Sequence, residues 1–139
     1  MTTQEVKRKL TAILSADVKG YSHLITKDEA GTLQTLNAHK EAIASLIRDH
    51  HGRVVDAPGD NLLAEFASVV DAVECGVEIQ RQLRARNDKA SVHRKMDFRI
   101  EINLEKGWAE VKDRNPILHY FISCTFLPVI FDPQHHLRL

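Results

Sequence analysis

The stretch Gly52–Phe66, GRVVDAPGDNLLAEF, decides the fold that we predict for this chain. Two apolar pairs, Val54-Val55 and Leu62-Leu63, flank a run of turn-forming residues from Pro58 to Asn61. This pattern predicts two antiparallel strands joined by a tight turn. A carboxylate near the tip of such a hairpin is held firmly and still reaches solvent, so Asp60 can face a cation or a phosphate.

A second carboxylate is expected beside it, from the segment Thr11–Ser22, TAILSADVKGYS. An apolar run there predicts a buried strand that ends at Asp17 and opens into a loop containing Gly20. Two aspartates at neighbouring strand ends repel each other unless a cation lies between them, and Mg²⁺ prefers such oxygen ligands. The spacing alone leaves a second interpretation open, in which Asp17 is an ordinary strand-end residue and Asp60 an ordinary turn residue.

Two amphipathic helices and one further strand surround this hairpin. Apolar residues at helical spacing predict helices over 28–50 and 68–87, with Asp28 or Thr26 capping the first and Ser68 the second. Gly52 is expected to end the first helix. The alternating segment MDFRIEINL, residues 96–104, predicts a half-buried strand. The order strand, helix, hairpin, helix, strand is typical of an α/β (α+β) sandwich with helices on one face of the sheet.

Composition excludes several classes of protein. The chain has 139 residues, 43% hydrophobic, and its 19 basic residues balance its 19 acidic ones, so bulk charge favours neither nucleic acid nor an anionic membrane as a partner. The longest apolar-rich stretch, 117–131, is shorter than the ~20 residues of a membrane span. Cys75 and Cys124 match no metal-binding spacing, so we expect buried thiols and a reducing, cytoplasmic location. His50 and His51 at a helix end are expected to complement the helix dipole rather than to bind a metal.

Three segments resemble a known family in the same order: KLTAILSADVKGYS, then DEAGTLQTLNAHKEAIASLIRDHHGRVVDAPGDNLLAEFASVVDAVECGVEIQRQL, then FRIEINL. Together they span 9–104 and are similar to the N-terminal portion of a bacterial class III adenylate/guanylate cyclase catalytic domain. The resemblance implies a ferredoxin-like cyclase sandwich with βαββαβ order and a mostly antiparallel sheet, incomplete at the C-terminus. It also implies three regions: a disordered N-terminus over 1–8, a cyclase-like core over 9–104 and a divergent tail over 105–139.

The resemblance assigns roles to particular residues. It implies that Asp17 and Asp60 bind two divalent ions, Mg²⁺ or Mn²⁺, and that Val18 adds its backbone carbonyl. The following residues would hold a nucleoside triphosphate; they are Lys19, Gly20, Tyr21 and Ser22. The implied reaction is attack of the ribose 3′-hydroxyl on the α-phosphate, which gives a 3′,5′-cyclic nucleotide and pyrophosphate. Such domains work as homodimers, or paired with another cyclase domain, with the site at the interface.

The sequence departs from the family pattern at three places. Asp56 stands at the position of the base-selecting lysine, and 101–106 reads EINLEK where the family has GINLGD. Beyond Leu104 the resemblance stops, and the adjacent Arg114 and Asn115 do not have the one-turn spacing of the family's transition-state arginine and asparagine. No catalytic residue is therefore assigned. We expect a cyclase domain for ATP, in preference to GTP, impaired by loss of the C-terminal half-site. The alternatives are a non-catalytic cyclase-like nucleotide-binding or dimerisation module, and a small α/β binding domain without a nucleotide role.

Overall fold

The computed structural model describes the backbone of residues 6–112, 115–120, 129–132 and 135–138, and the side chains of 11–104. The elements follow one another along the chain as β1 (Val6–Val18), α1 (Tyr21–Lys27), α2 (Glu29–Asp49), β2 (Arg53–Asp56), β3 (Leu62–Phe66), α3 (Val69–Lys89), the 3₁₀ helix η1 (Val92–Arg94), β4 (Phe98–Lys112), β5 (Asn115–Tyr120), β6 (Val129–Asp132) and β7 (His135–Arg138).

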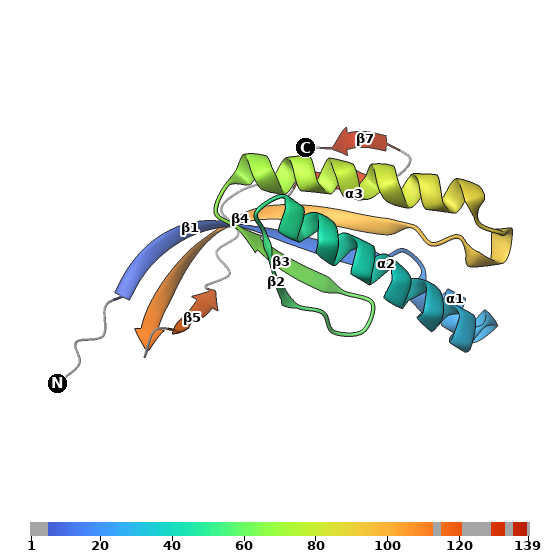
Figure 1. Cartoon of the computed structure of the whole chain (residues 1–139), viewed down its shortest axis with the longest axis horizontal. Coiled ribbons are helices and arrows are strands. Elements are labelled where there is room, and N and C mark those ends of the chain that lie inside the picture. Colours follow the sequence, from blue (N-terminus) through green and yellow to red (C-terminus); the bar gives the residue numbers. More distant parts are fainter. Residues whose placement is uncertain (1–5, 113–114, 121–128, 133–134, 139) are drawn as a thin grey trace.

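The described strands form one sheet in the order β2-β3-β1-β4-β6-β7, with β5 pairing to β4 off this path. Each of their pairings is antiparallel. Through β4, this order and direction confirm the α+β sandwich with βαββαβ connectivity. Figure 1 shows α2 and α3 side by side over one face of the sheet, while β1 and β4 continue together beyond the helices towards β5.

Strand alternation sorts the side chains between a buried face and an open face. In β3, burial alternates strictly from Leu62 to Phe66, and β1 and β4 show the same period of two. The helix-facing side of these strands supplies much of the core, namely Ala12, Leu14, Ala16, Val18, Leu62, Ala64, Phe66, Phe98, Ile100 and Ile102. The intervening residues, among them Asp17 and Arg99, therefore lie on the face away from the helices.

The helix starts confirm the predicted caps. The Asp28 side chain accepts a hydrogen bond from the Gly31 N–H at 3.1 Å, and the Ser68 hydroxyl accepts one from the Asp71 N–H at 3.3 Å. The end of α2 differs from the prediction, because His51, with φ 63°, takes the left-handed conformation instead of Gly52. Gly52 is needed there for a different reason: a Cβ on it would lie 2.4 Å from Phe66 Cε1.

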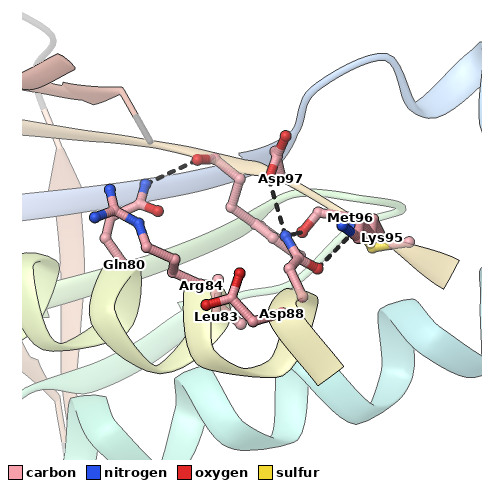
Figure 2. A pocket seen from close by; sticks show the side chains of 9 residues that line it. Gln80, Leu83, Arg84, Asp88, Lys95, Met96 and Asp97 are labelled. Carbon is pink, nitrogen blue, oxygen red and sulfur yellow. Dashed lines mark hydrogen bonds between the residues drawn. The ribbon is translucent and has the colours of Figure 1, made fainter. Parts of the chain in front are cut away.

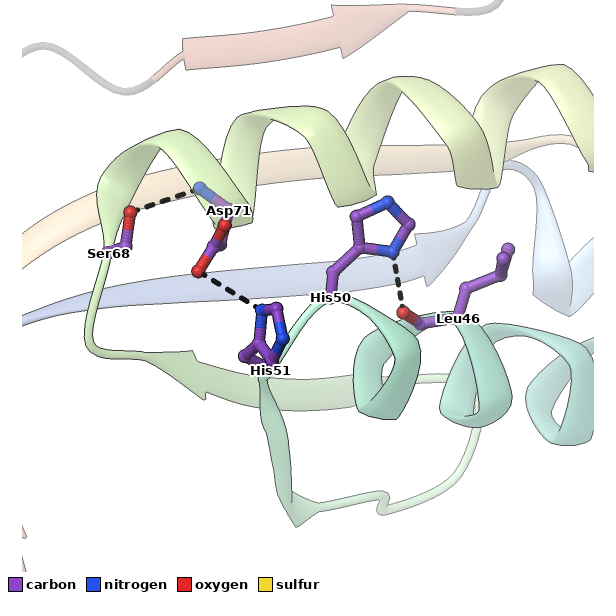
Figure 3. Close-up of polar contacts among 5 residues, drawn as sticks. All are labelled: Leu46, His50, His51, Ser68 and Asp71. Carbon is purple, nitrogen blue, oxygen red and sulfur yellow. Dashed lines mark hydrogen bonds and ion pairs between the residues drawn. The ribbon is translucent and has the colours of Figure 1, made fainter.

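A polar contact joins the end of α2 to the first turn of α3, beside a second contact within α2 (Figure 3). His50 Nδ1 lies 2.8 Å from the Leu46 carbonyl oxygen, so this ring binds one of the last carbonyls of α2. His51 Nδ1 lies 3.6 Å from Asp71 Oδ2 in the first turn of α3. The His50 contact fits the predicted role at the end of α2, whereas His51 faces a carboxylate on α3.

Several boundaries lie elsewhere than expected. Strand β1 begins at Val6 and pairs with β4 from the Val6–Glu110 match onward, so residues 6–8 belong to a strand instead of a disordered terminus, and 1–5 lie outside the described residues. Strand β4 runs without a break past Leu104 to Lys112. Further along, β6 pairs with β4 at Ile100–Ile102. Part of the predicted divergent tail thus extends the sheet, because these backbone groups find ladder partners that the sequence pattern did not reveal.

Cys75 is a buried free thiol, as predicted, and burial together with the charge of Asp49 raises its pKa to about 12. Cys124 lies outside the described residues. Within the described part of the chain, no helix combines the length and the apolar character that crossing a bilayer requires.

Candidate nucleotide and metal site

Asp17 is the last residue but one of β1, on the open face of the sheet. Its partner across the ladder is Arg99 on β4, whose guanidinium Nη2 donates a short hydrogen bond to Asp17 Oδ2. The Asp17 side chain is 23% exposed and that of Arg99 is 54% exposed. The sheet therefore presents a carboxylate with a cationic partner at a solvent-reachable position.

Asp60 lies at the same end of the sheet. The register between β1 and β3 pairs Ala16 with Leu62, and continuing it by two residues brings Asp60 level with Val18. The pKa of Arg99 is raised by its hydrogen bond to Asp17 and by the charge of that carboxylate, and then by the charges of Glu101 and Asp60. Asp17, Asp60 and Arg99 therefore lie at the same end of the sheet, and the sharing of a cation by the two aspartates stays a prediction.

Val18 contributes to this site only through its backbone, since its side chain is 3% exposed and packs in the core. This placement is compatible with the predicted role of its carbonyl.

The predicted phosphate loop is shorter than expected, because α1 begins at Tyr21. The Lys19 N–H donates to the Asp97 carbonyl at 2.8 Å and so is already engaged. Gly20, with φ 69°, caps the helix, and its carbonyl accepts from the His23 and Leu24 N–H groups. The N–H groups of Gly20, Tyr21 and Ser22 come before the first hydrogen-bonded N–H groups of α1, so they remain the candidate phosphate donors of this loop.

A side chain from α3 fixes the strand opposite this loop. The Asn87 amide accepts from the Met96 N–H at 3.0 Å and donates to the Met96 carbonyl at 3.1 Å and to Asp97 Oδ1 at 2.9 Å. Because the Asp97 carbonyl holds Lys19, Asn87 helps to set where the loop leaves β1. A pocket of about 250 Å³ lies beside this contact, between α3 and the entry to β4 (Figure 2). Its lining does not include Asp17, Asp60 or Arg99.

Asp56 is the last residue of β2, where the hairpin turn begins. Its carboxylate Oδ1 accepts from the N–H of the next residue, Ala57, at 2.8 Å, and the side chain is exposed. A register shift between Val54 and Asp56 marks a bulge at this point in the strand. Asp56 therefore acts locally on the turn in this structure, and its consequence for the choice of base stays a prediction.

The donors present fit a hard divalent cation. Asp17 and Asp60 offer carboxylate oxygens and Val18 a carbonyl oxygen, and the Arg99 guanidinium shows that a positive charge is accommodated beside Asp17. The side chains described in 11–104 contain no group of three or more acidic, histidine or cysteine residues that would form a complete protein cage. One or two carboxylates completed by substrate phosphates and water are the usual set for Mg²⁺.

Arg99 is the residue that reasoning from the sequence missed. The alternating pattern of 96–104 already placed it on the face opposite Phe98 and Ile100. What the sequence lacked was the register that sets it against Asp17, because pairing between strands 82 residues apart depends on the whole sheet.

No protein-family model matches the chain. Putative adenylate cyclase 3 of Rhizobium meliloti (strain 1021) is 40% identical over 114 residues, which is 81% of this chain and 19% of that protein. The crystal structure of an adenylate/guanylate cyclase/hydrolase from Silicibacter pomeroyi is 31% identical with a TM-score of 0.65, over 81% of this chain and 65% of that one. The guanylyl cyclase Cya2 shares the fold, with a TM-score of 0.68 at 21% identity, over 85% of this chain and 66% of that one.

The chain thus spans about a fifth of the curated relative and about two thirds of each of these two solved structures. The match covers most of this chain in sequence and in fold, and the resemblance predicted from residues 9–104 is confirmed. Over that part, the chain belongs to the class III adenylate/guanylate cyclases.

Proposed function

We propose that this chain supplies the metal- and phosphate-binding half of a nucleotidyl cyclase site. The observation that carries the proposal is the Asp17–Arg99 pair on the open face of the sheet, at the same end as Asp60, in a chain of this family. Asp17, Asp60 and the Val18 carbonyl would hold two Mg²⁺ or Mn²⁺ ions. Those ions, when bound, would supply Lewis-acid activation of the 3′-hydroxyl and neutralise the charge of the leaving pyrophosphate.

The chain's own residues would bind and orient the triphosphate. The N–H groups of Gly20, Tyr21 and Ser22 lie at the start of α1, and the exposed Lys19 side chain adds a positive charge there. Arg99 is already charged and half exposed, so it can exchange its carboxylate partner for a phosphate oxygen. The proposed substrate is ATP in preference to GTP, and the proposed setting is the cytoplasm.

We further propose that the 139-residue chain by itself catalyses nucleotide cyclisation only slowly. No asparagine and arginine at the family's spacing follow Leu104, and loss of one preorganised stabilising group costs roughly 10²-fold or more in rate. Pairing in a homodimer does not restore groups that both copies lack. A partner cyclase domain that carries them would complete the site at the interface.

Asp56 supports a second candidate function, a non-catalytic nucleotide-binding or dimerisation module. An acidic side chain at the base-selecting position cannot take a lysine's role toward a purine. Such a module would bind nucleotide with metal but form no product, either alone or with a partner domain.

The test measures binding and product separately. Fluorescent ATP and GTP analogues are titrated with Mn²⁺ into the purified chain, and cyclic nucleotide is quantified by chromatography. We expect binding that is lost in Asp17→Asn and Asp60→Asn and kept in Asp88→Asn, an exposed carboxylate on α3. Rapid product from the chain alone would refute the impairment, and product restored by a partner domain would exclude the non-catalytic module. Absence of nucleotide binding with Mn²⁺ would refute the proposed function.

A further inference from the structure

A lysine on α2 reaches the tip of the β2–β3 hairpin. Lys40 Nζ donates a hydrogen bond to the Ala57 carbonyl at 3.0 Å and a shorter one to the Gly59 carbonyl. These two carbonyls lie on either side of Pro58. One ammonium group from a helix thus ties together the turn that carries Asp60.

The turn has little packing of its own to hold it. Residues 55–59 are exposed, and a Cβ built on Gly59 would meet nothing within 4 Å. Its internal support consists of the Asn61 N–H donating to the Pro58 carbonyl at 2.9 Å and the Asp56 carboxylate accepting from Ala57. Lys40 adds the contact that links this turn to the helical layer.

The Gly59 carbonyl belongs to the peptide group that joins Gly59 to Asp60. Because a peptide group is planar, a hydrogen bond that fixes this carbonyl also fixes the direction in which the chain enters Asp60. A carboxylate that binds a cation must be held within about 0.5 Å of its productive position. The Lys40 contact therefore acts on the orientation of the Asp60 side chain.

We propose that Lys40 is a positioning residue that sets Asp60 for cation binding. This inference rests on the proposed function, in which Asp60 is a metal ligand. For cation affinity, the positioning role and the charge of Lys40 predict opposite effects when Lys40 is removed. Removing a nearby positive charge would by itself tighten cation binding, whereas releasing the turn would weaken it. The direction of the change thus separates positioning from electrostatics.

The experiment compares the full 139-residue wild-type chain with Lys40→Met, Lys40→Arg and a control, Lys89→Met, at an exposed lysine in the last turn of α3. Hydrogen exchange in metal-free protein reports the Asn61 amide, and Mn²⁺ titration followed by electron paramagnetic resonance reports affinity. In Lys40→Met we expect Asn61 to exchange roughly tenfold faster and Mn²⁺ to bind roughly tenfold more weakly, the lower end of the effect of losing one hydrogen bond from a charged group. Lys40→Arg should recover part of both, and Lys89→Met should match wild type.

Unchanged exchange in Lys40→Met would overturn the contact's role in ordering the turn. Faster exchange with equal or tighter Mn²⁺ binding would overturn the positioning of Asp60. If wild-type chain bound no Mn²⁺, or if Asp60→Asn bound it as well as wild type, the proposed function and the positioning role would both fail. The exchange result would then still decide whether Lys40 orders the turn.

Discussion

Substituting Arg99 with glutamine should change metal binding and nucleotide binding in opposite directions. In the free protein the guanidinium holds Asp17, so an arriving cation must displace it or share the carboxylate. The pair is partly exposed, and such pairs contribute about 0.2–1 kcal/mol. Removing Arg99 should therefore tighten Mn²⁺ binding without nucleotide by roughly 1.4- to 5-fold.

With nucleotide present the same substitution removes a donor to phosphate. A hydrogen bond involving a charged group is worth about 1.5–3 kcal/mol, so the affinity for Mn²⁺-ATP should fall by roughly 10- to 150-fold. Titration calorimetry with Mn²⁺ alone, and with a non-hydrolysable ATP analogue in saturating Mn²⁺, measures both quantities.

Arg53→Gln provides a matched control. Arg53 pairs with Glu65 at 2.6 Å, and its side chain is 58% exposed, close to the 54% of Arg99. It stands on β2, separated from β1 by β3. We expect Arg53→Gln to leave both affinities unchanged. Weaker or unaltered Mn²⁺ binding in Arg99→Gln would refute the idea that Arg99 and the cation share Asp17.

Three further predictions concern stability. Gly52→Ala should lower the free energy of unfolding by about 1–3 kcal/mol in urea titrations, because the new Cβ would lie 2.4 Å from Phe66 Cε1 and 2.9 Å from Ile47 Cγ2; wild-type stability would show that this contact relaxes freely. His39 is 6% exposed, its Nδ1 has no hydrogen-bond partner among the described residues, and burial, followed by the charge of Arg86, lowers its pKa. The unfolded chain then binds more protons than the folded one, so the free energy of unfolding should fall as pH drops below about 6.5. In His39→Leu, the free energies of unfolding at about pH 7.5 and about pH 5.5 should differ less than in wild type. An unchanged difference would assign the pH dependence to other groups. Ser68→Ala should cost about 1 kcal/mol through the lost cap on α3, measured by thermal unfolding, with Ser91→Ala, whose side chain makes no capping hydrogen bond, as the control that should cost less.

Local patterns predicted much of the fold. The caps at Asp28 and Ser68 were predictable because a polar side chain bonding to an amide three residues later is a short-range interaction. The hairpin and the alternating strand of 96–104 were predictable for the same reason, since turn residues and a period of two are read within a few positions.

What escaped prediction depends on long-range packing. His51 takes the left-handed conformation, and the need for glycine at position 52 comes from Phe66, which lies 14 residues further along the chain and fills the space beside Gly52. Similarly, Asp17 and Asp60 could be named from the sequence, but the partners that act on them, Arg99 and Lys40, come from β4 and α2. Their contacts are set by register and helix placement, which no local pattern encodes.

The alternation of β1 limits how this strand can change in evolution. Ala16 and Val18 point into the core on either side of Asp17, and β1 is paired on both edges. An insertion or deletion of a single residue before Asp17 would turn its carboxylate towards the apolar layer, where an unpaired charge costs several kcal/mol. Changes of two residues would keep every side chain on its own face. Length variants of this strand that retain the carboxylate on the open face should therefore differ by even numbers of residues.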